Sequence, residues 1–395
     1  MTHAVLRLKK GRERARVHPW IFKGDVADVS DVEAGTVVTV VDSAGGFVGR
    51  GFYNPRPALC CRIVTWRDEA LDGRLWRRRV DAALAHRRRV VTGGTAARLI
   101  WSESDGLPGF VADRYGDVLV VQCSTLGVAR VRSDLAVALR SALGDLPVFM
   151  ADEEVPAHLE GFEARRGWLD ASGPASAVVE EPGAGGTVRL AVTFGTGHKT
   201  GLYLDQRENR HRFGALARGR DVLDAFAYTS AFACHGLVGG ARRAVCIESS
   251  PEAVAAAREN FTLNGVADRA EIVASNAFDE LRRLDRARDR FGLIALDPPP
   301  FARHRAAVDA ARRGYKEVNL RAIRLLEPGG VLATFSCSHH ITTTDFADIC
   351  RAAATDAGAN VRVLADLTQS PDHPVLLTVP ETRYLKGLLL ERADS

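Results

Sequence analysis

Residues 221–261, DVLDAFAYTSAFACHGLVGGARRAVCIESSPEAVAAARENF, hold two short apolar strands and the beginning of a repeating pattern. DVLDAF (221–226) and AVCIES (244–249) each have the length and apolar content of a buried strand. Residues 251–265, PEAVAAARENFTLNG, have the composition of a helix that ends at Asn-Gly. Short apolar strands that alternate with helices predict an α/β fold whose parallel sheet is covered on both faces.

The same alternation continues towards the end of the chain. Further strands are predicted in AEIVAS (270–275), FGLIALD (291–297) and VLATFS (331–336). No helix separates PVLLTVP (374–380) from YLKGLLLER (384–392), so we expect these two to close the sheet as an antiparallel pair.

The part of the chain before residue 186 has a different character. Strands are predicted at 5–8, 36–41, 47–53 and 58–66, which together make a β-barrel or sandwich of about seventy residues. A helix over 71–91, a hairpin over 106–125 and a helix over 129–143 follow, and residues 172–186 have the composition of a linker. We therefore expect domains at 1–70, 71–185 and 186–395.

Composition narrows the class of protein. A chain of 395 residues exceeds one ordinary core, and a formal net charge of +4 is too small to indicate a nucleic-acid binder by itself. The seven cysteines form no C-x-x-C pair, which is typical of a reduced compartment. Without an apolar signal segment at the N-terminus or a run long enough to span a bilayer, a cytoplasmic location is expected.

Polar residues end the predicted strands of the C-terminal domain. In doubly wound sheets ligands bind outside the carboxyl ends of the strands, where this chain has Asp224, Glu248, Asn276, Asp297 and Cys337. An acid such as Glu248 suits the ribose hydroxyls of a nucleoside, although it could equally cap the next helix. Since neither a G-x-G-x-x-G motif nor a P-loop is present, a nucleoside without a pyrophosphate, such as S-adenosylmethionine, fits better than a dinucleotide.

Four segments, in order, carry a resemblance to a known family. They are LKKGRERARVHPWIFKGDV (8–26), ESDGLPGFVADRYGDVLVVQ (103–122), HKTGLYLDQRENR (198–210) and the stretch from LDPPPF to FSCSHH (296–340). Together they resemble the large-subunit rRNA cytosine-5 methyltransferases that carry an N-terminal PUA domain, and the likeness covers essentially the whole chain. It implies a PUA-like β-barrel, a small central α/β domain and a C-terminal Rossmann-like class I methyltransferase domain.

The resemblance also implies roles for particular residues, with S-adenosylmethionine as cofactor and large-subunit rRNA as partner. Asp297 lies beside the target base and Cys337 is the attacking thiol. Glu248 holds the ribose and Asn276 approaches the adenine. The rest of the implied cofactor site comprises Gln206, Arg207, Asp224, Phe226, Ser230, Ala231 and Asp297.

Basic residues are the expected RNA contacts. Lys9, Lys10, Arg12 and Arg14 precede the second predicted strand, and Lys199 lies in the HKTG run. In an RNA enzyme such side chains neutralise phosphates, although arginine clusters such as 77–79 and 87–89 are more often solvated helix faces. The oligomeric state, a homodimer included, is left open by the sequence.

The cofactor site departs from the family pattern at Ser230, Ala231 and Asn276. Ser230 and Ala231 stand where family members usually carry two glycines, and a side chain there costs about 1 kcal/mol if the backbone needs a positive φ. Asn276 replaces a usual aspartate, and its carbonyl can still accept from an adenine amino group. A non-catalytic RNA-binding protein with a decayed cofactor pocket is therefore an alternative to the enzyme.

Cys337 can be interpreted in three ways. Most lone cysteines are small core residues, and C-x-H-H lacks the second ligand pair of a metal site, so no metal is expected. The resemblance favours a nucleophile, with room for a base beside the small neighbours Ser336 and Ser338. The same fold acting on another base or position, with an idle Cys337, is the remaining alternative.

Overall fold

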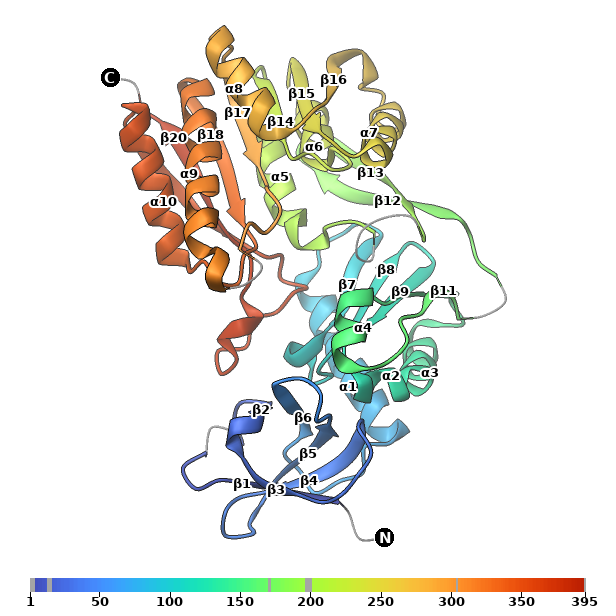
Figure 1. The fold of residues 1–395 in the computed structure, drawn as a ribbon. Coiled ribbons are helices and arrows are strands. Elements are labelled where there is room, and N and C mark those ends of the chain that lie inside the picture. Colours follow the sequence, from blue (N-terminus) through green and yellow to red (C-terminus); the bar gives the residue numbers. More distant parts are fainter. Residues whose placement is uncertain (1–3, 13–15, 170–171, 196–200, 303–304, 394–395) are drawn as a thin grey trace. The chain divides into compact units, whose positions relative to one another are not determined.

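The computed structural model describes residues 4–12, 16–169, 172–195, 201–302 and 305–393. The chain forms two compact units. The first unit comprises residues 1–177, 192–202 and 371–382, and the second comprises residues 178–191, 203–370 and 383–395 (Figure 1). Among the described residues, no helix is both long enough and apolar enough to cross a membrane. The predicted division into three domains stays a prediction.

A six-stranded sheet opens the first unit, in the order β2-β6-β5-β4-β1-β3. Its strands are β1 (Ala4–Leu8), β2 (Trp20–Phe22), β3 (Val26–Val29), β4 (Thr36–Val41), β5 (Phe47–Tyr53) and β6 (Leu59–Thr65). Alternate apolar side chains of these strands, such as Leu6, Val38 and Ile63, form one buried cluster. The four predicted strands of this region are confirmed, because each has apolar residues at the spacing that buries one face.

The first unit also contains a five-stranded sheet in the order β11-β10-β9-β8-β7. It is built from β7 (Ala96–Trp101), β8 (Phe110–Tyr115), β9 (Val118–Cys123), β10 (Val148–Ala151) and β11 (Arg166–Trp168). The predicted hairpin is β8 and β9, which turn at Gly116 with φ +60°. The helices of this unit are α1 (Gly73–Val90), α2 (Leu126–Arg130), α3 (Arg132–Leu143) and α4 (Glu154–Glu160).

Residues 371–382 belong to the first unit although they come late in the sequence. Arg87 of α1 is buried and donates to the Asp372 carbonyl at 2.9 Å, and the Arg98 N–H donates to the Asp372 carboxylate at 3.0 Å. Polar groups with almost no access to solvent are costly unless they are hydrogen-bonded, so Asp372 completes the polar contacts of α1 and β7.

The predicted linker over 172–186 contains the boundary between the two units, after Ala177, but most of it is not irregular. Residues 176–183 form β12 (Ser176–Gly183), which pairs with β13 (Gly186–Thr193) in a two-stranded sheet. Val179 and Glu181 are both buried, and Glu181 accepts two hydrogen bonds from the buried Arg210 and faces His235 at 3.0 Å. Residues 176–183 therefore form a strand despite the Pro- and Gly-rich composition, and the buried ion pair of Glu181 with Arg210 holds this strand in place.

The second unit is a seven-stranded sheet in the order β16-β15-β14-β17-β18-β20-β19. Its strands are β14 (Asp221–Ala225), β15 (Arg243–Glu248), β16 (Ala270–Ala274), β17 (Phe291–Leu296), β18 (Leu326–Ser336), β19 (Val361–Thr368) and β20 (Lys386–Arg392). The first five strands pair in parallel, and β20 lies antiparallel between β18 and β19. The predicted antiparallel pair is thus present, but its other member is β19 rather than residues 374–380.

Helices pack on both faces of this sheet (Figure 1). They are α5 (Arg207–Ala215), α6 (Ala231–Val238), α7 (Pro251–Leu263), α8 (Ala277–Ala287), α9 (Val308–Leu325) and α10 (Thr343–Ala357). Leu332 of β18 packs in one core with α8, α9 and α10, whereas Phe335, three residues on, contacts Phe232 of α6. Successive side chains of a strand point to opposite faces, so α6 covers the face opposite to α9.

Candidate active site

The predicted site residues lie at one edge of the second unit's sheet. The strand order reverses between β14 and β17, which is where ligands bind in open α/β sheets. Asp224 is the next-to-last residue of β14, and Glu248 is the last residue of β15. Asp297 directly follows β17, and Cys337 directly follows β18. Asn276 follows β16 by two residues. The structure therefore brings the five predicted residues to the carboxyl ends of five neighbouring strands.

Asp224 is a buried carboxyl group without an ion pair among the described residues. Its side chain accepts one hydrogen bond, at 3.0 Å, from the N–H of Ala233 in the first turn of α6. Burial raises the pKa of Asp224 well above that of an ordinary aspartate, the Ala233 N–H opposes this change, and the negative charges of Asp297 and Glu248 add to it. Three carboxyl groups therefore concentrate negative charge at the sheet edge, and a positively charged ligand would relieve it.

Glu248 organises the loop that follows β14. One carboxylate oxygen accepts the Tyr228 N–H at 2.8 Å, and the other accepts the N–H groups of Ser249 and Ser250, also at 2.8 Å. Each carboxylate oxygen has two lone pairs, so the oxygen that binds Tyr228 has capacity for one further donor. The proposed helix-cap alternative is not what the structure has, because the side chain of Ser250 caps α7 by accepting from Ala253.

The β14–α6 loop has an unusual backbone. Phe226, Tyr228 and Ser230 adopt left-handed conformations, with φ values of +61°, +49° and +56°. Each such residue costs about 1–2 kcal/mol when it is not glycine. Ser230 therefore has the positive φ at which a side chain is costly, whereas Ala231 has no positive φ and begins α6. Strained residues of this kind cluster at ligand sites, where the surrounding structure holds them in place.

The remaining cofactor candidates are spread along the same edge. Gln206 donates to the Asp297 carboxylate at 2.9 Å and accepts from Asn209 at 2.6 Å. Arg207 is buried and contacts Glu208 at 3.3 Å. Asn276 is exposed and caps α8 through the Phe278 N–H at 2.9 Å. Gln206 therefore joins Asp297 directly, whereas Asn276 lies farther along the edge with a structural role of its own.

Cys337 differs from every other cysteine of the chain. The other six are buried, and only Cys337 is partly exposed. Its neighbours Ser336 and Ser338 are fully buried, and the expectation that their small size leaves room for a base stays a prediction. The Ser338 hydroxyl lies 2.9 Å from the Tyr315 hydroxyl and accepts the Ala302 N–H at 3.3 Å. The two serines therefore fix the backbone, and Cys337, between them, is the residue that reaches solvent.

Two residues of this site were missed in the sequence. Tyr203 is half-buried, and burial first and then the charge of Asp297 raise its pKa; Cys337 contributes in the same direction. Its ring meets that of Tyr228 edge-on, with 5.3 Å between centroids. Lys386 donates to the Ser338 carbonyl at 2.6 Å. Lys386 could have been found from the sequence, because it is a charged residue inside the apolar run YLKGLLLER. The sequence around Tyr203 has no comparable signal.

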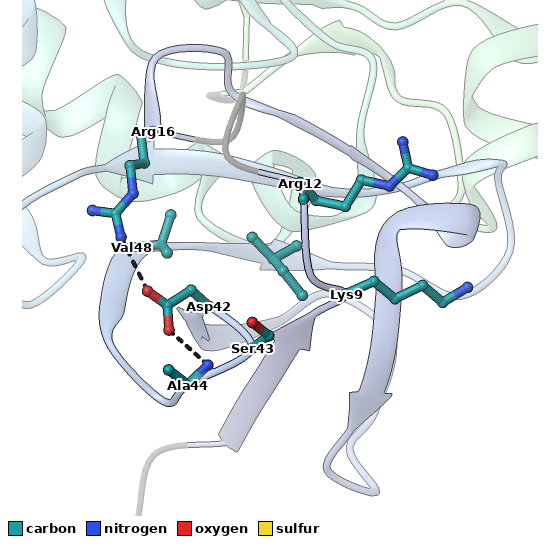
Figure 2. Close-up of a pocket in the computed structure, with 9 residues that line it drawn as sticks. Lys9, Arg12, Arg16, Asp42, Ser43, Ala44 and Val48 are labelled. Carbon is teal, nitrogen blue, oxygen red and sulfur yellow. Dashed lines mark hydrogen bonds and ion pairs between the residues drawn. The ribbon is translucent and has the colours of Figure 1, made fainter.

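The basic residues near the N-terminus border a cavity of about 200 Å³ in the first unit. Arg16 forms an ion pair with Asp42 at 3.0 Å on one side (Figure 2). Lys9 donates to the Gly24 carbonyl at 3.0 Å and Arg12 pairs with Asp25 at 3.2 Å, so both turn towards the short helix over 23–25. Lys10 is exposed. Arg14 and Lys199 lie outside the described residues.

Comparison with known proteins agrees with this architecture. A family model for a PUA-like domain matches residues 6–66, and one for S-adenosylmethionine-dependent methyltransferases matches residues 168–389. Ribosomal RNA large subunit methyltransferase I of Alteromonas mediterranea is 35% identical over 99% of this chain and 98% of its own length. The protein of the same name from Klebsiella pneumoniae is 38% identical over 96% of both chains.

The chain belongs to the ribosomal RNA large subunit methyltransferase I family. It thus combines a PUA-like domain with an S-adenosylmethionine-dependent methyltransferase domain. A methyltransferase of known structure from Streptococcus mutans has the same fold, with a TM-score of 0.84, 18% identity and coverage of 98% and 99% of the two chains. A structure with the same scores is a methyltransferase complexed with SAH. The expected fold and family are confirmed.

S-adenosylmethionine is the cofactor of this methyltransferase family. The site geometry fits it: the cofactor carries two positive charges, on its sulfonium and its α-ammonium group, and Asp224 and Glu248 form no ion pair with any described residue. The buried Asp224 is the stronger indication, because an uncompensated buried carboxyl group is costly and is usually found where a ligand or proton completes it.

Proposed function

We propose that this methyltransferase forms 5-methylcytosine in large-subunit rRNA through a covalent adduct with Cys337. The relatives' names support the rRNA substrate. The observation that carries the mechanism is the position of Cys337, the one partly exposed thiol of the chain, at the end of the strand next to the one that Asp297 follows. The free thiols and the proposed substrate favour a cytoplasmic location.

The chemistry requires a nucleophile because C5 of cytosine is itself a poor one. The Cys337 thiolate adds to C6, and the ring then becomes electron-rich at C5. S-adenosylmethionine supplies an electrophilic methyl group. Asp297, which accepts from Gln206 at 2.9 Å, carries a proton in this step and donates it in a hydrogen bond to N3 as negative charge builds there. A base at the site or a water molecule then takes the C5 proton, and the electron pair of the C5–H bond re-forms the C5–C6 double bond as the C6–S bond breaks, so the thiolate is returned unchanged.

The cofactor roles follow the geometry of the sheet edge. Asp224, with the loop through Phe226, Ser230 and Ala231, faces the charged methionine end. Glu248 accepts a ribose hydroxyl on its remaining lone pair, and Asn276 meets the adenine. Gln206, which donates to Asp297, and its neighbour Arg207 border the cofactor in this proposal. The strained β14–α6 loop supports this assignment, because the Glu248–Tyr228 hydrogen bond holds it in one conformation.

The PUA-like domain supplies RNA affinity in this proposal. Lys9, Lys10 and Arg12 are exposed, and Lys9 and Lys10 make no ion pair with a described carboxylate. Arg14 and Lys199 are proposed to contact phosphates as well. Cationic side chains on an exposed surface bind RNA largely through its phosphates, with affinity that falls as salt rises.

The test of the mechanism uses Cys337→Ser and an RNA that carries 5-fluorocytidine at the target position. The wild-type protein should form an adduct that survives denaturation, because the fluorine at C5 cannot leave as a proton does. Cys337→Ser should form none and should not turn over. Binding of cofactor and RNA should stay near normal, which is the control for folding. Adduct formation by the serine variant would refute the assignment, and nucleoside analysis of methylated RNA identifies the modified base.

A further inference from the structure

Lys386 lies at the same sheet edge as Cys337. It is the first residue of β20, where it pairs with Ser336 of β18 on one side and Thr368 of β19 on the other. Its side chain is buried, and its ammonium group donates to the carbonyl oxygen of Ser338 at 2.6 Å. The lysine nitrogen is therefore held against the residue that directly follows Cys337.

This buried cation has no carboxylate partner among the described residues. Asp345, the acid of α10 whose charge reaches it, forms an ion pair with Arg312 at 2.5 Å and accepts from Thr342 in a capping box. Burial lowers the pKa of Lys386 to about 8, and the negative charges of Cys337 and Asp345 act in the opposite direction. A buried charge is costly unless an opposite charge compensates it.

The charge of Cys337 also reaches two phenols among the described residues. Tyr203 precedes α5 and Tyr315 lies on α9, and burial raises the pKa of both phenols. Both are therefore neutral at physiological pH. Lys386, in contrast, is a cation that a hydrogen bond to Ser338 holds beside the segment of this thiol.

We propose that Lys386 is the counter-ion of the Cys337 thiolate and acts as a positioning residue for the nucleophile. The pair satisfies two needs at once, since the ammonium gains an anionic partner and the thiol gains a cation that favours its reactive form. The hydrogen bond to the Ser338 carbonyl holds the cation in place. The catalytic meaning of this pair rests on the proposed function of Cys337.

Alkylation of the full-length protein tests the pair without RNA or cofactor. Because the other six cysteines are buried, iodoacetamide under native conditions reports on Cys337, and Cys337→Ser supplies the blank. The rate should be measured between pH 6 and 10 for the wild type and for Lys386→Met, Lys386→Gln and Lys386→Arg. Lys316→Met is the matched control, because Lys316 lies on α9 in an exposed ion pair with Asp356.

In Lys386→Met and Lys386→Gln, the pH at which alkylation is half-maximal should rise by about one unit or more, with ~10-fold slower reaction at pH 7. Lys386→Arg and Lys316→Met should follow the wild type. Thermal unfolding separates a change in thiol reactivity from a loss of structure. Lys386→Met removes a buried charge and adds an apolar side chain, so its melting temperature should not fall below that of the wild type. Superposed profiles for the wild type and both neutral variants would refute the pair. Failure of RNA trapping with a shifted profile would refute only the proposed function.

Discussion

Asp224→Asn should make the methyltransferase more stable and less able to bind its cofactor. The amide has the size of the carboxyl group and can still accept the Ala233 N–H, so packing and the helix contact are retained. What it removes is a negative charge that is 2% exposed and lies beside two others. At pH 8 we expect the free energy of unfolding to rise by about 1–3 kcal/mol, the range in which uncompensated buried polar groups cost stability.

The pH dependence follows from the raised pKa of Asp224. Between the ordinary aspartate value, about 3.9, and the raised value, the folded protein holds a proton that the unfolded chain has released. The carboxyl group therefore stabilises the fold least at high pH, after its proton is lost. The advantage of Asp224→Asn should be largest at pH 8 and should disappear as pH falls towards about 4.

Urea unfolding at several pH values and calorimetry with S-adenosylmethionine measure the two effects. Cofactor affinity should fall about 10- to 150-fold, which corresponds to ~1.5–3 kcal/mol for one hydrogen bond to a charged group. Asp221→Asn is the control on the same strand: burial alone would raise the pKa of Asp221, but Arg242 and Arg243 hold it below the ordinary value. That variant should lose stability at pH 8. A destabilised Asp224→Asn, or a gain that does not change with pH, would refute the reasoning.

Two further predictions concern the cofactor and RNA surfaces. Glu248→Ala should weaken cofactor binding by about 1.5–3 kcal/mol for each ribose hydrogen bond lost. It should also lower the melting temperature, because the Tyr228 N–H loses its acceptor. Unchanged affinity in calorimetry would contradict the ribose role. Joint replacement of Lys9 and Lys10 by Ala should weaken binding to a large-subunit rRNA fragment and reduce the slope of log affinity against log salt by about 1 per phosphate contact, as measured by filter binding. An unchanged slope would remove these two side chains from the RNA interface.

The position of the site was predictable because it depends on local signals. Each strand of the second unit is a short apolar run, and parallel strands present their carboxyl ends at one edge. Asp224, Glu248, Asp297 and Cys337 could therefore be assigned to one place without knowledge of the packing. The strand over 361–368 was missed because charged residues interrupt it, and 374–380 was mistaken for a strand although Leu377 is 97% exposed.

Contacts between distant residues were beyond the reach of the sequence. Lys386 meets the segment of Cys337 only through the antiparallel register of β18 and β20, which pairs residues fifty positions apart. The left-handed loop carries Phe226, Tyr228 and Ser230, none of which is the glycine that usually signals such a backbone. Glu181 was assigned to a linker because the sequence does not show its contact with Arg210, which lies 29 residues further along the chain.

The late segment of the first unit has a consequence for synthesis on the ribosome. Arg87 is made 285 residues before Asp372, whose carbonyl it requires in the finished fold. At translation speeds of about 5–20 residues per second, Asp372 is synthesised about 15–60 s after Arg87 of α1. The first unit is therefore the earliest to emerge, yet a nascent chain that stops before residue 371 leaves it without a buried contact of its finished fold.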